Sequence, residues 1–314
     1  MIADAPNAPV WPRLGVGTWA WGDRHTWGYD RAYGRAEVGE AFRASLDIGI
    51  TFFDTAEVYG WGTSERILGE LRREAGRPIL IATKFAPFRL TARALLRALD
   101  GSLARLQVDS VDLYQIHFPP FFVRMNPLME ALAEAALGGK TKTVGVSNFS
   151  AEQMQRAQDI LGRRGVPLAG NQVEYSLLHR APESDGVLRT CRELGVPLIA
   201  YSPLAMGLLT GKYRPEGRRQ PMRLGRYLRA WRPEALSRVI RQLEEIGRAR
   251  SKTPSQVALN WLLRRPEVVV IPGAKNGRQA SENAGALGWE MTSDEAEALD
   301  RSTRPGRQPA PGSA

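Results

Sequence analysis

The chain has 314 residues, 43% of them hydrophobic and 24% charged, which makes a large buried core feasible and argues against global disorder. Its single cysteine, Cys191, excludes an internal disulfide, and one cysteine with three histidines cannot supply zinc-ligand spacing, so we expect no metal site. The formal net charge is +10, but the arginines are spread over predicted helical faces without interleaved aromatic residues. We therefore expect no nucleic-acid partner.

The two ends of the chain show no pattern typical of targeting. The first residues, Met1 to Pro6, lack a basic segment followed by an apolar one, and no run approaches the length that spans a membrane. We expect a cytoplasmic protein with no membrane partner, either a monomer or a homo-oligomer. Residues 301–314 are rich in Pro, Gly and Arg, which predicts a disordered tail behind a single domain at residues 1–300.

The first half of the chain alternates short apolar runs, which predict strands, with longer segments of helical periodicity. The predicted strands are residues 14–18, 48–53, 79–83 and 111–117. The predicted helices are residues 37–46, 63–71, 91–106 and 127–137. Thr63, followed by Ser64 and Glu65, predicts a hydroxyl cap at the start of the second helix.

The second half continues the alternation. Its predicted strands are residues 143–146, 168–172, 197–201 and 268–271. Its predicted helices are residues 150–162, 183–194, 234–249, 254–264 and 277–287. After the seventh strand, an insertion rich in Gly, Arg and Pro at about residues 206–232 predicts a long loop.

These segments make about eight strand–helix units, which predicts an α/β fold built as one parallel (β/α)₈ TIM barrel with a long loop after strand 7. The strands are continuous apolar runs, as expected when both faces of a sheet are covered. A doubly wound Rossmann sheet is the alternative, and residues 15–20 match the loose dinucleotide fingerprint G-x-G-x-x-G/A. Residues 21–25 do not open a helix, however, so we interpret this motif as a glycine-rich turn.

Three successive predicted strands end in polar residues: Asp54, Lys84 and His117. A buried aspartate is costly without a partner, and Lys84 is the obvious cation to pair with it. Tyr59 follows shortly after Asp54. Each residue alone could be structural, as an ion pair or a hydrogen-bonded core residue. Because the carboxyl ends of parallel strands meet at one face of a barrel, we expect the four side chains to form a catalytic site there.

Several sequence blocks together resemble the aldo-keto reductase superfamily, in the family's order and over roughly residues 13–290. The blocks are FFDTAEVYG, IATKF, DLYQIHFP, GVSNFS, NQVEYSLL, AYSPLAMGLLTGKY and IPGAKNGRQASENAGAL. The stretch Trp21-Gly22-Asp23 and the block NQVEYSLLHRAPE look closest to the plastid and cyanobacterial branch that includes pyridoxal reductase-like proteins. The resemblance implies a barrel enzyme that reduces an aldehyde or ketone to the alcohol.

The chemistry of such a reduction assigns a role to each of the four residues. Hydride must come from a nicotinamide cofactor, because no side chain supplies it. Tyr59 is the expected general acid, and a neighbouring Lys84 ammonium is expected to lower its pKa from the ordinary value near 10. Asp54 is expected to keep Lys84 charged and in place. His117 is expected to orient the substrate carbonyl by hydrogen bonding.

The resemblance also implies a cofactor site. Lys275 and a helix N-terminus near it favour the 2′-phosphate of NADPH over NADH. Gln279 stands where some family members place an arginine on the adenine, and Thr141 replaces an apolar residue that is usual before its strand. The expected cofactor-binding residues are Gly17, Thr18, Trp19, Asp54, Ser147, Asn148, Gln172, Tyr201, Ser202, Pro203, Leu204, Ala205, Gly207, Lys212, Gly273, Lys275, Gln279, Glu282 and Asn283.

Aromatic residues near the predicted strand ends favour an apolar or planar carbonyl substrate. The expected pocket residues are Trp19, Trp21, Phe85 and Phe118. Two alternatives to the enzyme stay open. The same barrel could bind NADPH and mainly regulate a partner, as in the potassium-channel β subunits that it also resembles. It could also be a barrel lyase or hydrolase that uses no cofactor.

Overall fold

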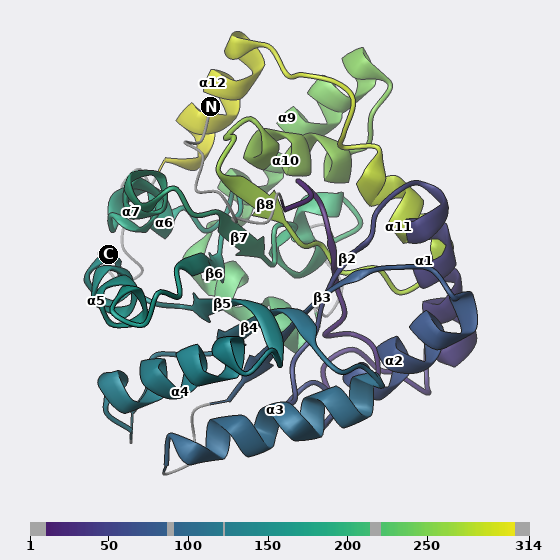
Figure 1. The fold of residues 1–314 in the computed structure, drawn as a ribbon. Coiled ribbons are helices and arrows are strands. Elements are labelled where there is room, and N and C mark those ends of the chain that lie inside the picture. The colour runs from purple at the N-terminus through teal and green to yellow at the C-terminus, as the bar shows by residue number, and fades with distance from the viewer. Residues whose placement is uncertain (1–10, 87–90, 122, 214–220, 305–314) are drawn as a thin grey trace.

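The computed structural model describes residues 11–86, 91–121, 123–213 and 221–304. Eight parallel strands pair in sequence order, and parallel bridges from Leu14 to Val270 and from Gly17 to Gly273 join the last strand to the first (Figure 1). The predicted (β/α)₈ barrel is confirmed, and the Rossmann alternative is wrong because the strand order never reverses. The strands are β1 (Val16–Gly17), β2 (Phe52–Asp54), β3 (Leu80–Phe85), β4 (Val111–Ile116), β5 (Thr141–Ser147), β6 (Leu168–Glu174), β7 (Leu198–Tyr201) and β8 (Val268–Val270).

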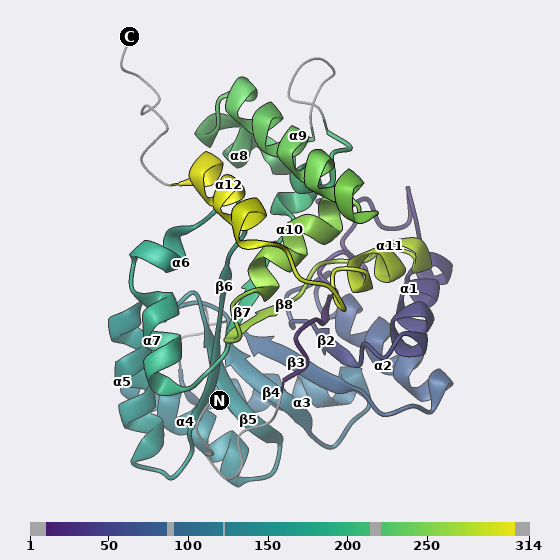
Figure 2. The same ribbon diagram turned by 90° about the horizontal axis from the view of Figure 1, so that it is seen from above.

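Helices surround the strands on the outside, as the view from above shows (Figure 2). The helices between consecutive strands in the first half of the chain are α1 (Arg35–Asp47), α2 (Thr63–Ala75), α3 (Arg93–Leu106) and α4 (Met125–Leu137). In the second half α5 (Ala151–Gly162), α6 (Ala181–Ser184), α7 (Val187–Leu194), α9 (Pro233–Arg250) and α10 (Pro254–Leu263) lie between strands, and α11 (Gly277–Ala284) follows β8. The predicted helix 183–194 is thus two helices, separated at Gly186, whose φ angle of 88° is in the left-handed region.

Two further predictions are wrong in detail. The insertion after β7 is partly helical, since it holds the 3₁₀ helices η1 (Ala205–Thr210) and η2 (Met222–Leu224) and the helix α8 (Gly225–Ala230); residues 214–220 lie outside the described residues. Thr63 does not cap α2, because the capping position is Gly62 in a left-handed conformation without a side-chain hydrogen bond.

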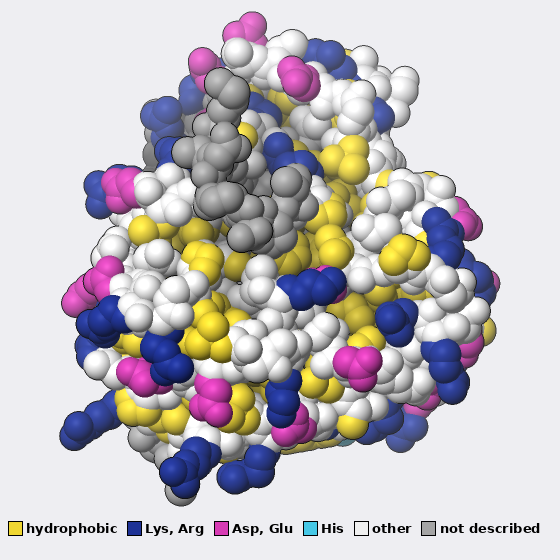
Figure 3. Space-filling view, in the orientation of Figure 1, with side chains coloured by type: hydrophobic (Ala, Val, Ile, Leu, Met, Phe, Trp, Pro, Cys, Tyr) yellow, Lys and Arg dark blue, Asp and Glu magenta, His cyan; other side chains and the backbone are white. Residues whose placement is uncertain are grey.

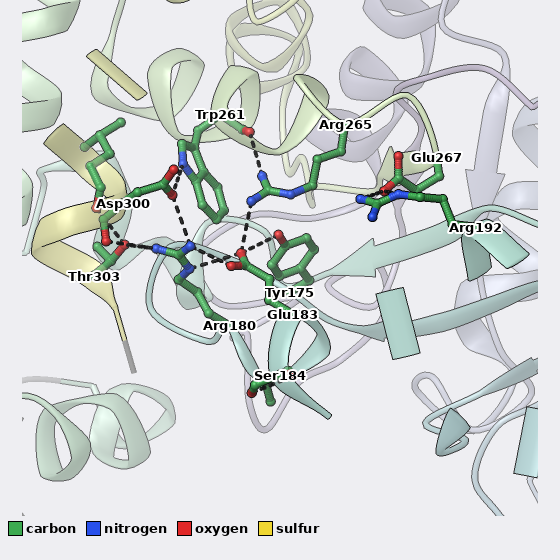
Figure 4. Close-up of polar contacts among 12 residues, drawn as sticks. Tyr175, Arg180, Glu183, Ser184, Arg192, Trp261, Arg265, Glu267, Asp300 and Thr303 are labelled. Carbon is green, nitrogen blue, oxygen red and sulfur yellow. Dashed lines mark hydrogen bonds and ion pairs between the residues drawn. The ribbon is translucent and has the colours of Figure 1, made fainter. Parts of the chain in front are cut away.

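The C-terminal helix α12 (Ser293–Thr303) was not predicted, although Thr292 and Glu295 form a capping box at its start. The tail predicted from Arg301 therefore begins too early, and residues 305–314 lie outside the described residues. The buried Arg180 side chain anchors α12, since it donates to the Thr303 hydroxyl at 2.9 Å and pairs with Asp300 at 3.1 Å (Figure 4).

The barrel interior explains how the site is positioned. One buried apolar cluster inside the barrel contains Phe52 of β2, Ala82 of β3 and Leu113 of β4. Alternate residues of a strand point to the same face, so the side chains two positions further along each strand also point inward. These are Asp54, Lys84 and Gln115. The sequence thus places a polar layer toward the carboxyl ends of the strands and an apolar layer two residues before it.

The outer surface carries both signs of charge. On the face seen in Figure 3, Lys and Arg side chains are interspersed with Asp and Glu side chains instead of gathering in a stripe. Across the described residues, the helices lack the length and apolar character needed to cross a bilayer. The cytoplasmic location and the absence of a nucleic-acid partner stay predictions.

Candidate active site

Asp54 and Lys84 form a buried ion pair at the end of β2 and β3. Lys84 Nζ lies 2.5 Å from Asp54 Oδ1, and the two side chains are 0% and 2% exposed. The ammonium also donates to the Thr55 carbonyl at 2.7 Å and lies 3.4 Å from the Tyr59 hydroxyl. Burial lowers the pKa of Lys84, and the Asp54 carboxylate opposes this shift. The predicted pairing of the two residues is confirmed.

The second oxygen of Asp54 is held by an amide from the far side of the barrel. Gln172 Nε2, at the end of β6, donates to Asp54 Oδ2 at 2.8 Å, and Gln115 Nε2 lies 3.5 Å from the same oxygen. A buried carboxylate requires such partners for both oxygens. Gln172, predicted at the cofactor, therefore also orients Asp54.

Tyr59 is partly buried beside this pair, and its ring lies under the Lys84 ammonium at 4.9 Å. Burial raises the pKa of its phenol well above the ordinary value, and the Asp54 charge adds to the shift. The prediction that Lys84 lowers this pKa is therefore wrong for the ligand-free protein. The physical reason is burial, which disfavours the charged phenolate, and the negative charge of Asp54 acts in the same direction. Tyr59 is held protonated, as a proton donor must be.

His117 follows β4 and stacks on Phe118, with ring centroids 4.6 Å apart and an interplanar angle of 4°. It faces Tyr59 edge to face at 5.8 Å. Burial and the nearby Lys84 charge lower the pKa of His117 to about 3, so the imidazole is neutral at physiological pH. Its Nδ1 is buried without a hydrogen-bond partner in the described structure. A buried polar atom of this kind is a candidate for contact with a bound molecule.

A cavity of about 680 Å³ opens above the four residues, with Asp54, Tyr59 and His117 in its wall. Its volume is within the range of about 300–1,000 Å³ that is typical of small-molecule sites. The predicted cofactor and pocket residues that line it are Gly17, Trp19, Asp54, Phe118, Ser147, Asn148, Gln172, Tyr201, Ser202, Pro203, Leu204, Gly207, Lys212, Gly273, Lys275, Gln279, Glu282 and Asn283.

Four of the predicted cofactor and pocket residues do not line the cavity. Thr18 and Ala205 are fully buried, and the Thr18 hydroxyl bonds the Asp54 backbone carbonyl at 2.9 Å. Trp21 and Phe85 are also fully buried; the Trp21 indole N–H donates to the Ala274 carbonyl at 2.8 Å. The prediction for Trp21 and Phe85 is therefore wrong: their rings pack in the core and do not face the pocket.

Comparison with protein families identifies the family to which the chain belongs. The model of the Aldo/keto reductase family matches residues 13–304. The chain belongs to the aldo/keto reductase family. This finding confirms the resemblance drawn from the sequence blocks, and it makes the chain an oxidoreductase.

Two named relatives show where this aldo/keto reductase lies within its family. The chloroplastic pyridoxal reductase of Arabidopsis thaliana is 39% identical over 303 residues, which cover 90% of this chain and 80% of the relative. The L-glyceraldehyde 3-phosphate reductase of Escherichia coli K12 is 34% identical over 298 residues, which cover 88% of this chain and 84% of the relative. The first match supports the branch suggested by the sequence.

Solved structures of similar proteins agree in fold. An aldo-keto reductase from Klebsiella pneumoniae in complex with NADPH is 31% identical, with a TM-score of 0.74, over 95% of this chain and 93% of that chain. A glycerol dehydrogenase from Gluconobacter oxydans is 28% identical, with a TM-score of 0.82, over 96% of this chain and 95% of that chain.

A chain of polar contacts links the ends of β4, β5 and β7 in this aldo/keto reductase. Tyr201 donates to Asn148 Oδ1 at 3.0 Å, while Asn148 Nδ2 donates to the His117 carbonyl at 3.0 Å. Ser147 donates to the Gln172 carbonyl at 2.7 Å. Asn148 and Ser202 have φ angles of 61° and 49°, a strained conformation for non-glycine residues that is concentrated at functional sites.

Lys275 lies at the other end of the cavity. Its ammonium is 4.6 Å from the centroids of both the Trp27 and Tyr33 rings. Burial and the neighbouring charges of Arg223 and Lys212 lower the pKa of Lys275 to about 8. Gln279 Oε1 accepts the Lys275 backbone N–H at 2.9 Å, so this amide fixes the loop that carries the lysine. A cluster of cations at this end suits an anionic group.

Sequence reasoning missed ten residues of the cavity wall. Two of them are Trp27 and Arg278, of which Arg278 stands next to Gln279 in the chain. The others are Ala20, Val58, Met206, Thr210, Arg226, Ser255, Ile271 and Pro272. Ala20, Val58, Met206 and Pro272 each stand next to an assigned residue in the chain, which was the available signal, whereas the other four do not. Among the described residues, no group of three or more His, Cys, Asp or Glu could hold a metal ion.

Proposed function

We propose that the protein reduces an aldehyde or ketone to the alcohol with NADPH, and that Tyr59 donates the proton. The observation that carries this proposal is the position of Lys84, which lies 2.5 Å from Asp54 and 3.4 Å from the Tyr59 hydroxyl, just behind two residues that line a large cavity. An ordinary structural ion pair needs no protonated phenol and no unpartnered imidazole beside it.

The cavity fits a dinucleotide in its chemistry. Asn148, Ser147 and Gln172 supply amide and hydroxyl groups suited to a carboxamide, and the Tyr201 ring suits stacking. At the other end Lys275 and Lys212 supply the charge that phosphate groups require. The NADPH-bound Klebsiella pneumoniae relative supports this choice of cofactor. When bound, a nicotinamide supplies the hydride, which no side chain can provide.

The protein's own residues then have separate tasks. The protonated Tyr59 hydroxyl donates to the carbonyl oxygen as negative charge develops there. Lys84, held by Asp54, stabilises the phenolate that the transfer leaves behind. The neutral His117 imidazole orients the carbonyl by a hydrogen bond, because its pKa is too low for it to act as a cationic acid.

The walls near the reacting groups favour a planar or apolar substrate. The Trp19 ring stacks on Tyr59 with centroids 6.1 Å apart and meets Trp27 edge to face at 5.6 Å. Phe118, which is 44% exposed, covers the other side of His117. Flat aromatic walls bind flat rings best, so aromatic aldehydes are the expected substrate class.

The test is a carbonyl panel with purified protein. We expect NADPH oxidation with planar aldehydes such as pyridoxal and benzaldehyde, and slower oxidation with short aliphatic aldehydes or glyceraldehyde 3-phosphate. NADPH should quench the fluorescence of the tryptophans, two of which line the cavity. Tight NADPH binding with no turnover on the whole panel would instead favour a regulatory module, and no binding at all would favour chemistry without a cofactor.

A further inference from the structure

The turn that carries Tyr59 leads directly into α2. Gly60, Trp61 and Gly62 all have positive φ angles, of 55°, 53° and 83°. A left-handed backbone is costly for a bulky residue such as Trp61, so surrounding contacts must hold the turn. The Ser64 N–H donates to the Tyr59 carbonyl at 3.2 Å. The position of Tyr59 therefore depends on how the first turn of α2 is anchored.

One anchor is a chain of buried hydroxyl groups. Ser64 Oγ lies 2.7 Å from Thr18 Oγ1 and accepts the Thr55 hydroxyl at 2.9 Å. Thr18 in turn donates to the Asp54 carbonyl at 2.9 Å. These contacts join α2 to the ends of β1 and β2. Thr18, expected at the cofactor, is instead part of this support.

The second anchor is a carboxylate. Glu65 is 0% exposed; its Oε1 accepts the Thr83 hydroxyl at 2.6 Å and its Oε2 accepts Arg105 Nε at 2.7 Å. Thr83 immediately precedes Lys84 in β3. Burial lowers the pKa of Lys84, and the charges of Asp54 and Glu65 both oppose this shift. Glu65 thus binds the residue next to Lys84, and its negative charge favours the charged form of the lysine.

We propose that Glu65 is a positioning residue for the proton transfer: it helps to keep Lys84 charged and anchors the turn that carries Tyr59. It does not line the cavity, so it acts through its neighbours. Besides Glu65, the groups that face Lys84 are the Asp54 carboxylate, the Tyr59 hydroxyl and the His117 imidazole. The catalytic part of this inference rests on the proposed function, whereas the charge of Lys84 can be measured without it.

The first test is the titration of Lys84 in the ligand-free protein. The chain has six lysines, so side-chain NMR signals of labelled lysine are few, and Lys84→Met assigns the relevant one. Glu65→Gln removes the charge, while Arg105→Gln breaks the same ion pair and keeps the Glu65 charge. We expect Lys84 to titrate about one pH unit lower in Glu65→Gln and no lower than wild type in Arg105→Gln. Equal titration in all three proteins overturns the inference.

If Glu65→Gln does not fold, a second variant still tests the proposal. The double variant Glu65→Gln/Arg105→Gln leaves no partly buried cation without its carboxylate, so it should fold more readily, and it should show the same low titration of Lys84. An unchanged titration in the double variant overturns the inference as well.

The second test is the pH dependence of kcat. Glu65→Gln should lower kcat about tenfold, and it should move the alkaline loss of activity to lower pH without changing the Kd for NADPH. Arg105→Gln should keep the wild-type alkaline limb. A purely structural ion pair predicts the same profile for both variants, which contradicts the proposal. If wild type itself shows no turnover, the proposed function fails, and the lysine titration still decides the role of Glu65.

Discussion

Lys84 Nζ lies 2.5 Å from Asp54 Oδ1 at the centre of the barrel, and neither side chain is more than 2% exposed. Both charged groups are removed from water on folding. The buried pair is stable only because the remaining polar atoms of the two side chains also have hydrogen-bond partners. The Thr55 carbonyl accepts from the ammonium and the Gln172 amide donates to the second carboxylate oxygen. Such a pair is costly to break from one side.

Asp54→Asn tests that cost. The amide keeps the shape but leaves the Lys84 charge buried without a counter-charge, so we expect the free energy of unfolding to fall by about 3–5 kcal/mol. Urea denaturation measures it. Asp47→Asn is the control, because Asp47 pairs with Arg77 on the surface and its loss should change stability by about 1 kcal/mol or less. Equal effects of the two variants would contradict a buried, closed ion pair.

His117 should make the fold sensitive to acid. Its pKa in the folded protein is lowered to about 3, below the ordinary value of 6.5, so the unfolded state binds the proton more readily. Stability contributed by the neutral imidazole is present above pH 6.5 and is lost as the pH falls toward 3. We expect His117→Gln to lose less Tm than wild type between pH 7 and pH 5. His25→Gln, at an exposed histidine, should behave as wild type.

Lys275 should make the binding of NADPH weaker at high pH. Its pKa is lowered to about 8, so it loses its charge above that pH and attracts a phosphate less. The Kd for NADPH, measured by tryptophan quenching, should rise with pH above 8 more steeply than the Kd for NADH. Lys275→Met should remove this difference, whereas Lys140→Met, at a surface lysine paired with Asp100, should retain it. An unchanged NADPH preference in Lys275→Met would place the 2′-phosphate elsewhere.

Glu183 should stabilise the C-terminal helix without affecting the site. Its carboxylate accepts hydrogen bonds from Tyr175, Arg180 and Arg265, and the two guanidinium groups lie 5.0 Å and 4.5 Å from the Trp261 ring (Figure 4). Glu183→Ala leaves both cations without this partner and should lower the free energy of unfolding by about 3–5 kcal/mol. The neighbouring Ser184→Ala should be nearly neutral. A change in the Kd for NADPH would contradict a purely structural role for Glu183.

The sequence was sufficient to predict the barrel and the gathering of the proposed catalytic residues at the carboxyl ends of its strands, because both depend on local patterns. Continuous apolar runs mark strands, and a polar residue that ends such a run must lie at the carboxyl end of the barrel. Asp54, Lys84 and His117 were found in this way. The same reasoning failed for Trp21 and Phe85, since a position near a strand end does not determine whether the ring points into the cavity or into the core.

Interactions between distant segments could not be predicted. The Gln172 contact with Asp54 joins residues that are 118 positions apart, and Glu65 reaches Thr83 and Arg105 on two other elements. The pKa of Tyr59 also depends on this arrangement, because it is raised by burial of the phenol and by the charge of Asp54. The residue pattern of one segment carries no information about contacts with distant segments or about the pKa values that depend on them.

The most direct test of the account is the turnover of Tyr59→Phe. This variant keeps the Lys84–Asp54 pair and the cavity but removes the only atom proposed to donate the proton. We expect its Kd for NADPH to match wild type, while NADPH oxidation with the best aldehyde of the panel falls about 10²–10⁴-fold, the usual contribution of general acid catalysis. Wild-type turnover by Tyr59→Phe would contradict the central claim.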